Sequence, residues 1–255
     1  HQGIQTSMVK GAGIGVPGPV TEDGMVNHCV NLGWGKKQVT KELEALTGFA
    51  SRAGNDANVA ALGEVWKGGG RGYQDVLMVT IGTGIGGGLI VHGEMLIGAT
   101  GSAAEIGHMC VNPEETECCS CGGHGCLEQY ASATGILRMA KKYLAEQKVD
   151  SMLRQMTGLT TKDVIDAAKQ GDTLALQVVD QMAKAMGIAL AGCCAVADVE
   201  LFLIGGGVSK AGEFLLNPIR KYYRLFAFHT QKEAKFELAR LGNDAGIYGA
   251  ARLMI

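Results

Sequence analysis

Three patterns that direct proteins to membranes, secretion or nucleic acids are not found in the given sequence: a long hydrophobic run, the pattern of a signal peptide in its first residues and an excess of one charge. The most apolar stretch, 182–197, is interrupted by Lys184, Gly187 and Gly192 and falls short of the roughly 20 residues of a membrane span. The first residues, HQGIQTSMVKG, have no charged start followed by an apolar middle. With 25 acidic and 23 basic residues, the formal charge is only −2. We therefore expect a cytoplasmic protein.

Proline is scarce and glycine is abundant, with 4 prolines against 39 glycines. Many of the glycines follow short runs of apolar and β-branched residues, which is typical of strands that end in tight turns. This pattern predicts a strand over 11–20 that ends in a Pro-Gly turn and a strand over 75–82 that enters a glycine loop. It also predicts a hairpin over 87–98 that turns at His92 and Gly93, and a strand over 199–205 before a second glycine loop.

Helical patterns lie between the predicted strands. Apolar residues recur at the spacing of one buried helical face at Ile136, Met139, Ala140, Tyr143 and Leu144. Two further helices are expected over 173–197 and 214–225. The alternation of strands and helices predicts an α/β protein with layered sheets, and its length suits one or two domains.

The first glycine loop has a formal GxGxxG pattern at Gly82, Gly84 and Gly87. In a dinucleotide-binding fold this loop opens a helix, whereas here it continues into a predicted hairpin, so that interpretation is weak. We expect instead that its backbone N–H groups and the Thr83 hydroxyl approach phosphate oxygens. The alternative is that these glycines serve only a positive φ.

The second glycine loop, at Gly205, Gly206 and Gly207, precedes a helix that is predicted to begin near Ser209. A phosphate or a planar ring can approach a backbone without side chains, near the positive end of a helix. The Walker A pattern is absent, which argues against a P-loop NTPase.

Three acidic residues stand in unusual surroundings. Asp56 follows Asn55 where a strand-like segment meets a helical one, so it is either the N-cap of that helix or a base that accepts a proton from a hydroxyl attacking a γ-phosphate. Glu105 and Glu128 lie in apolar or glycine-rich segments. Either they bind neighbouring hydroxyls of a polyhydroxylated ligand or they are solvated loop acids.

Four of the eight cysteines are crowded into 118–126. A chain of this size does not need disulfides to form a core, so clustered thiols in a reducing compartment indicate a metal. His108, Cys119, Cys121 and Cys126 supply one nitrogen and three sulfurs, as in a closed structural zinc site. Cys118 is a rival because Cys118-x-x-Cys121 also has metal-ligand spacing. Free thiols are the remaining alternative.

Several motifs together resemble one family, the ROK sugar kinases. GIGVPGPV, NLGW, NDANVAALGE, IGTGIGGG, AEIGH and CSCGGHGCLE occur in its order and approximate spacing, and EQYASATGILR is similar to the bacterial glucokinase branch. The resemblance implies a two-lobed α/β fold of the actin-like, hexokinase-type (ribonuclease H-like) class with a cleft between the lobes. Residues 1–56 and a C-terminal helix at 244–255 would belong to a small lobe, and 57–243 to a large lobe with the zinc site.

This chain departs from the family pattern at two places. The family's N-terminal DxGGT hairpin is absent from residues 1–10, so we expect the first strands of the small lobe to be missing. Where the family often has GEIGH, this chain has Ala104 before Glu105, which removes a glycine and keeps the acid.

The resemblance also implies roles for single residues. Asp56 would be the catalytic base that takes the proton from the sugar 6-hydroxyl, and Asn55 would bind the sugar beside it. Three further sugar ligands would be Glu105, His108 and Glu128, with His108 holding zinc through its other ring nitrogen. Phosphate and nucleotide would be bound by Gly82, Thr83, Gly84, Gly205, Gly206 and Gly207.

The implied activity is ATP-dependent phosphorylation of glucose at O6, giving glucose 6-phosphate, with Mg²⁺ on the nucleotide and a structural Zn²⁺. The implied assembly is a homodimer or homotetramer. Two alternatives stay open: a sugar-responsive ROK repressor with an N-terminal winged helix, and a kinase for fructose, mannose or an N-acylated aminosugar. Asn55-Asp56, NLGW and ASATG favour the kinase.

Overall fold

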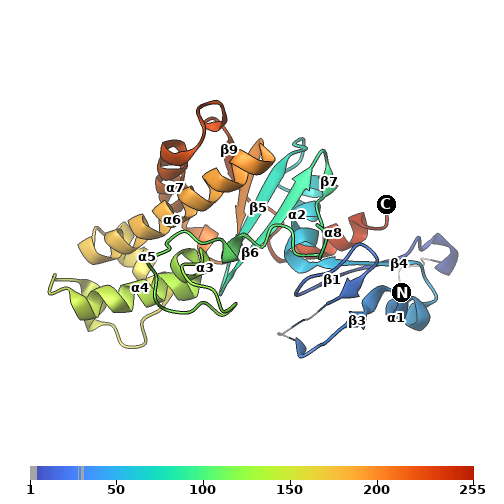
Figure 1. The fold of residues 1–255 in the computed structure, drawn as a ribbon, viewed down its shortest axis with the longest axis horizontal. Helices are drawn as coiled ribbons and strands as arrows, with labels where there is room; N and C mark the ends of the chain where they lie inside the picture. Colours follow the sequence, from blue (N-terminus) through green and yellow to red (C-terminus); the bar gives the residue numbers. More distant parts are fainter. Residues whose placement is uncertain (1–4, 28, 30–31) are drawn as a thin grey trace. The chain divides into compact units, whose positions relative to one another are not determined.

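The computed structural model describes residues 5–27, 29 and 32–255, so Asn31 of the NLGW motif and residues 1–4 lie outside the described part. The described residues form two compact units (Figure 1). Unit 1 comprises His1–Met78, Gly87–Ala104 and Ala239–Ile255, and unit 2 comprises Val79–Gly86 and Glu105–Leu238. Unit 1 therefore reaches past residue 56, and the assignment of a small and a large lobe stays a prediction.

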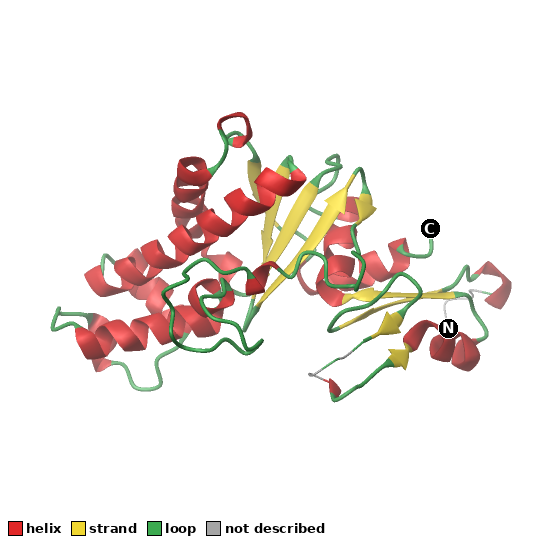
Figure 2. Cartoon of the chain, viewed as in Figure 1, coloured by secondary structure: helices red, strands yellow, loops and turns green. Residues whose placement is uncertain are grey.

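The strands of the described residues form three sheets, and Figure 2 shows the strands in yellow. In unit 1, β1 (Ala12–Val16) pairs in parallel with β4 (Ser51–Asn55), so that Val16 lies opposite Asn55. A short antiparallel pair is formed by β2 (Met25–Val26) and β3 (Lys37–Gln38). The five-stranded sheet has the order β7 (Glu94–Met95), β6 (Ile85–Val91), β5 (Val76–Ile81), β8 (Leu201–Gly205) and β9 (Lys235–Leu238).

The four strand predictions are confirmed. Gly18, with a φ of 89°, forms the Pro-Gly turn after β1, and the hairpin between β6 and β7 turns at His92 and Gly93, with φ of 52° and 79°. Such left-handed backbone at two successive residues suits the right-handed twist of the strands that they connect.

The described residues contain eight α-helices. These are α1 (Val39–Thr47), α2 (Asp56–Lys67), α3 (Glu128–Ala131), α4 (Ala133–Glu146), α5 (Thr161–Lys169), α6 (Thr173–Ala197), α7 (Glu213–Phe226) and α8 (Ala245–Arg252). Short 3-10 helices lie at Thr6–Met8, Ile106–His108, Met152–Gln155, Val208–Ala211, His229–Gln231 and Gly242–Asp244. The predicted helices at 173–197 and 214–225 are confirmed, and the helical face predicted from Ile136 to Leu144 lies in α4.

Helix α6 is the core helix of unit 2. By length and composition it is apolar enough to cross a membrane, but 61% of its most apolar window is buried inside the protein, as in the core helix of a soluble protein. Gly187 lets α7 approach it closely, because a β-carbon there would stand 2.5 Å from the Tyr222 β-carbon. Beneath α7, the rings of Phe202, Tyr223 and Phe236 pack with centroids 4.9 to 5.3 Å apart.

One helix prediction is wrong in its start. The segment after Gly207 forms a single 3-10 turn at Val208–Ala211, and α7 begins only at Glu213. Gly212 separates them because its φ of 65° and ψ of −141° are not helical. The second glycine loop is therefore followed by a short turn, and the expected dipole of a long helix does not begin there.

Unit 1 is held together by close packing of α2 against α8. A β-carbon on Gly63 or Gly249 would collide with the backbone of the other helix. The fully buried Glu64 carboxylate fixes the end of α2, because it accepts hydrogen bonds from the N–H groups of Gly69 and Leu241, both at 2.7 Å. These contacts hold α2, and with it the Asn55-Asp56 corner at its start.

Candidate active site

The Asn55-Asp56 corner joins β4 to α2. The Asn55 Oδ1 atom accepts hydrogen bonds from Ala57 N at 3.0 Å and Asn58 N at 3.1 Å, and its Nδ2 atom donates to Gly18 O at 3.1 Å. Asn55 is therefore the N-cap of α2. The interpretation of Asp56 as that cap is wrong, because the asparagine before it already satisfies the first amides of the helix.

Asp56 is the first residue of α2 and its side chain keeps access to solvent. Partial burial removes some of its hydration and raises its pKa, against the lowering effect of the Ala57 N–H, which donates to Oδ1 at 2.8 Å. A carboxylate with a raised pKa is a stronger base than a fully solvated one. This arrangement suits a general base.

The first glycine loop belongs to unit 2 and is anchored by the start of α4. Gly82 N donates to Gly84 O at 3.0 Å within the loop, and Gly82 O accepts from Ala133 N at 2.8 Å. The Thr83 carbonyl accepts from the Thr134 hydroxyl at 2.7 Å. The loop is thus held in one conformation by its own backbone and by the ASATG segment.

The Glu128 carboxylate connects this loop to the cysteine-rich segment. Its Oε2 accepts from Ile85 N at 3.1 Å, and its Oε1 accepts from the Ser120 hydroxyl at 3.2 Å. A β-carbon at position 84 would collide with Oε2, so any larger residue there would displace this carboxylate. Each carboxylate oxygen has a second lone pair, so Glu128 can still accept hydrogen bonds from a ligand.

The four predicted metal ligands come together in unit 2. One donor atom from each of His108, Cys119, Cys121 and Cys126 lies within 4.8 Å of the others. The His108 Nδ1 atom is 3.8 Å from the Cys119 sulfur, and the sulfurs of Cys121 and Cys126 are 3.6 Å apart. No described residue forms a hydrogen bond with the other ring nitrogen of His108, which leaves Nε2 available.

Cys118 faces a different partner. Its sulfur lies 3.7 Å from Nε2 of the exposed His124, and the two residues form a β-bridge. All eight cysteines are free thiols in the structure. Of the two adjacent cysteines, Cys119 therefore points into the cluster.

The donor chemistry of this cluster fits a soft divalent cation. Burial opposes ionisation of Cys119, but hydrogen bonds from the Cys121 backbone and from His108 outweigh it and lower the pKa of Cys119 to about 7. Burial together with the nearby thiols raises the pKa of Cys126 to about 12. A cation is what would allow these sulfurs to be thiolates side by side, and three sulfurs with one nitrogen are a zinc-type donor set.

A polar network that the sequence did not reveal supports the cysteine-rich segment. Arg138 of α4 donates to Glu115 at 2.8 Å and to Glu117 at 2.7 Å, and the Tyr130 hydroxyl donates to Glu115 at 2.7 Å. Burial would raise the pKa of Glu115, but the hydrogen bonds from Tyr130 and Arg138 lower it to about 2. The partners are 15 to 23 residues apart in sequence, so no local pattern could have indicated this network.

The second glycine loop and the first line one hollow of about 620 Å³ in unit 2. It is bounded by Gly82, Thr83, Ala133, Thr161, Lys162, Ile165, Asp166, Lys169, Gly207, Val208, Lys210 and Ala211. Of the six predicted nucleotide-binding residues, Gly82, Thr83 and Gly207 thus share a cavity. Gly206 instead packs on β5, with a φ of 87° and its α-carbon so close to Ile81 that no side chain fits.

Glu105 precedes the 3-10 helix of His108 and is exposed. Among the described residues its carboxylate takes part in no hydrogen bond or ion pair. Ala104 before it has a φ of 63°, a left-handed conformation that favours glycine, and this is the position where the family often has glycine. The alanine therefore carries backbone strain next to a candidate sugar ligand.

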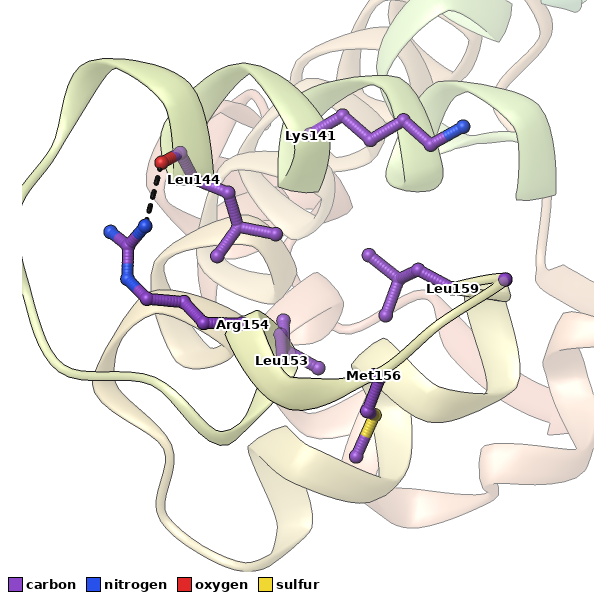
Figure 3. A pocket seen from close by; sticks show the side chains of 7 residues that line it. Lys141, Leu144, Leu153, Arg154, Met156 and Leu159 are labelled. Carbon is purple, nitrogen blue, oxygen red and sulfur yellow. Dashed lines mark hydrogen bonds between the residues drawn. The ribbon is translucent and has the colours of Figure 1, made fainter.

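Another hollow in unit 2, of about 560 Å³, contains none of the predicted site residues. It lies between α4 and the segment 153–159 and is lined by Lys141, Leu144, Leu153, Arg154, Met156, Gly158 and Leu159 (Figure 3). The described residues that line it include no acidic residue, so this hollow offers no general base for phosphoryl transfer. The Arg154 guanidinium is engaged with backbone carbonyls, including Leu144 O at 2.9 Å.

Comparison with known proteins identifies the family. The model of the ROK family matches residues 2–255. The chain belongs to the ROK family. This ROK chain is 44% identical over 249 residues to a glucokinase of Halalkalibacterium halodurans, covering 96% of the chain and 76% of that relative. A glucokinase of Thermotoga maritima is 39% identical over 251 residues, covering 95% of the chain and 78% of the relative.

A solved structure of similar fold is a ROK family glucokinase from Streptomyces griseus in complex with glucose and AMPPNP. It superposes with a TM-score of 0.80 at 37% sequence identity and covers 94% of this ROK chain and 80% of its own. The predicted fold class, an actin-like, hexokinase-type α/β fold, is confirmed by this likeness.

Proposed function

We propose that this ROK protein is a glucokinase, which transfers the γ-phosphoryl group of ATP to O6 of glucose. The observation that carries the proposal is its identity of 44% and 39% to two glucokinases across nearly the whole chain. The raised pKa of Asp56 and the anchored glycine loop of unit 2 are consistent with phosphoryl transfer. We further propose that the protein works in the cytoplasm as a dimer or tetramer.

In this proposal Asp56 accepts the proton of the sugar 6-hydroxyl as O6 attacks the γ-phosphorus. Asn55 binds the sugar through the second hydrogen of its Nδ2, since Oδ1 is committed to the helix amides and the first hydrogen to Gly18 O. The carboxylates of Glu105 and Glu128 accept hydrogen bonds from sugar hydroxyls, and His108 binds a hydroxyl through Nε2. These contacts orient O6 and let the chemical step proceed without a covalent intermediate.

The nucleotide is bound as its magnesium complex by the hollow of unit 2. The Gly82–Gly84 loop brings the N–H groups of Thr83 and Gly84 to the phosphates, since Gly82 N is paired with Gly84 O. Of the second glycine loop, Gly207 forms part of the wall on the other side, and Gly205 and Gly206 support it from behind. Three cationic side chains that were not predicted from the sequence also line this hollow: Lys162, Lys169 and Lys210. We assign no protein ligand to Mg²⁺, which enters with ATP.

The cluster of His108, Cys119, Cys121 and Cys126 would hold Zn²⁺. When bound, zinc supplies a structural crosslink and no redox or acid chemistry. It would fix the imidazole of His108 by one nitrogen, so that the other keeps a defined direction toward the sugar. Arg138 holds the start of the same segment, because it binds Glu115 and Glu117, which precede the cysteines in sequence.

The proposal is tested with the complete gene product, ATP and a panel of hexoses, by following ADP release. The highest kcat/KM is expected with glucose; a preference for fructose, mannose or an N-acylated aminosugar would assign the protein to another kinase of the family. The repressor alternative is tested by a DNA mobility-shift assay on the same protein. Sugar-dependent DNA binding without ADP release would replace the kinase by the repressor.

A further inference from the structure

The Gly82–Gly84 loop leaves two backbone N–H groups unused. Its three carbonyls are all occupied: Gly84 O accepts from Gly82 N, Gly82 O from Ala133 N, and Thr83 O from the Thr134 hydroxyl. By contrast, no described residue accepts a hydrogen bond from the N–H of Thr83 or Gly84. Two adjacent unpaired N–H groups on a glycine loop are a ready site for an anion.

The occupied carbonyls and the free N–H groups belong to the same peptides. The carbonyl of Gly82 and the N–H of Thr83 lie in one peptide plane, and the carbonyl of Thr83 and the N–H of Gly84 lie in the next. In a trans peptide the C=O and N–H bonds point in opposite directions. An anchor on each carbonyl therefore turns the corresponding N–H away from the anchor.

The two anchors come from consecutive residues at the start of α4. Ala133 supplies a backbone N–H at 2.8 Å, and Thr134 supplies a hydroxyl at 2.7 Å. A carbonyl only accepts, so the Thr134 hydroxyl is the donor in its contact with Thr83. The Ser132 hydroxyl lies 2.9 Å from Thr134 Oγ1 and limits its rotation.

Of the two anchor residues, Ala133 is itself fixed and lies at the hollow. Thr161 at the start of α5 donates its hydroxyl to Ala133 O at 2.6 Å, so the Ala133 backbone is held from both sides. Ala133 and Thr161 line the same 620 Å³ hollow as Gly82 and Thr83. A preorganised pair of donors is worth more to a developing negative charge than a pair that must reorient during the reaction.

We propose that Thr134 is a positioning residue for phosphoryl transfer, whose side-chain hydroxyl orients the Gly84 N–H toward a phosphate oxygen of the nucleotide. This inference rests on the proposed nucleotide-binding function of the loop and extends it to a residue that is not part of the lining of the hollow. An N–H group can only donate a hydrogen bond, so its ligand must be an acceptor. In this proposal that acceptor is an anionic phosphate oxygen of the nucleotide. Ala133 holds the neighbouring Thr83 N–H in the same way through its backbone N–H, which only a substitution to proline would remove.

The test compares Thr134→Val, which keeps the shape and loses the hydroxyl, with Thr134→Ser, which keeps the hydroxyl. In Thr134→Val, kcat with ATP is expected to fall about 10- to 100-fold, as for a misplaced donor to the transition state. The KM for glucose and the melting temperature should change little, and Thr134→Ser should recover most of kcat. A purely structural role would instead lower the melting temperature and leave kcat of the folded fraction unchanged.

The matched control is Thr47→Val in α1. Thr47 also donates its hydroxyl to a backbone carbonyl, Leu43 O, at 2.7 Å, and it is exposed. The same substitution there removes the same kind of hydrogen bond outside the proposed site. Its kcat with ATP is expected to equal that of the unmodified protein.

Amide NMR separates a failure of this inference from a failure of the proposed function. Mg-AMPPNP is added to the unmodified protein, and the N–H signals of Thr83 and Gly84 are followed. If they do not respond, the loop does not bind phosphate and the proposed nucleotide site is wrong. If they respond but Thr134→Val keeps its kcat, or if Thr134→Ser is as slow as Thr134→Val, the role of the Thr134 hydroxyl is overturned while the nucleotide site stands.

Discussion

The Glu128 carboxylate lies directly over Gly84, where it accepts a hydrogen bond from the next N–H along the chain, Ile85 N, at 3.1 Å. A candidate sugar ligand thus touches the loop that is proposed to bind phosphate. Any side chain at position 84 would push this carboxylate away. The two proposed substrate sites are therefore linked by a single contact inside unit 2.

Gly84→Ala is expected to displace Glu128 and to weaken glucose binding. The lost carboxylate contacts should raise the KM for glucose about 10-fold, the cost of one hydrogen bond to a charged group. Steady-state kinetics with varied glucose measures this effect. Gly246→Ala in α8 is the control, because a β-carbon there meets no atom within 4 Å. An unchanged KM for glucose in Gly84→Ala would separate Glu128 from sugar binding.

Asp56→Asn tests the general base. Turnover is expected to fall by about 10² to 10⁴, while calorimetry shows glucose binding largely intact. Unchanged turnover would remove Asp56 from this role.

The raised pKa of Asp56 has opposite expected effects on activity and on stability as pH rises. Activity should rise with pH as Asp56 loses its proton, with a midpoint above the ordinary value of 3.8. A folded-state pKa above the unfolded one favours the folded state at low pH, and this advantage is lost as pH rises through the folded pKa. At neutral pH the neutral Asp56→Asn protein should therefore be no less stable to urea than the unmodified protein.

Glu115→Gln should destabilise the protein by about 2 kcal/mol at neutral pH, since it removes a charge that Tyr130 and Arg138 hydrogen-bond. The folded-state pKa of about 2 lies below the ordinary 4.5, so the stabilisation is present above pH 4.5 and is lost as pH falls toward 2. Urea unfolding of both proteins across this range should show their difference shrinking.

Glu117→Gln is the matched control for this network. Glu117 pairs with the same Arg138, but its side chain is 60% exposed, against 9% for Glu115. An exposed ion pair contributes less, so this substitution should cost below about 1 kcal/mol. Equal losses from the two substitutions would contradict the role of burial.

Cys119→Ser and Cys118→Ser should differ in metal content. The purified protein is expected to contain about one zinc per chain, and Cys119→Ser should lose most of it. Cys118→Ser should retain it, because its sulfur faces His124. Elemental analysis and thermal melting measure both effects. A stable, active preparation without metal would discard the zinc site.

Ala104→Gly is expected to stabilise the protein. The left-handed φ of 63° costs alanine about 1 to 2 kcal/mol, whereas glycine pays about 0.5 to 1 kcal/mol of extra chain entropy. The net gain should be about 0.5 to 1 kcal/mol in urea unfolding. Ala103→Gly, at the neighbouring position without a positive φ, should have the opposite sign. Equal losses at both positions would show that Ala104 is not strained.

Much of the fold could be predicted because it depends on local pattern. The strands before the glycine loops and the helix at 173–197 follow from alternation and spacing of apolar residues, and the gathering of His108 with three cysteines follows from donor type. The false start of α7 near Ser209 depends on the backbone of one glycine, Gly212, which the sequence does not specify.

The supporting contacts of the site could not be predicted. Thr134 meets Thr83 across 51 positions and Ser120 meets Glu128 across 8, and both contacts exist only because strands and helices bring them together. The capping role of Asn55 was missed for a different reason. Asparagine and aspartate are both good N-caps, so the sequence does not decide which of positions 55 and 56 is the cap.

Unit 1 is built from three separate segments of the chain, and this affects the order in which the two units can fold during synthesis. Glu64 and the glycines of α2 find their partners only in Leu241 and α8, which leave the ribosome after the whole of 105–238. During synthesis α2 must therefore wait, with the Glu64 carboxylate paired to Gly69 N but not yet to Leu241 N, while the metal-binding unit is already able to fold. A nascent chain halted before residue 239 would present a finished second unit and an open first one, a natural point for chaperones to engage.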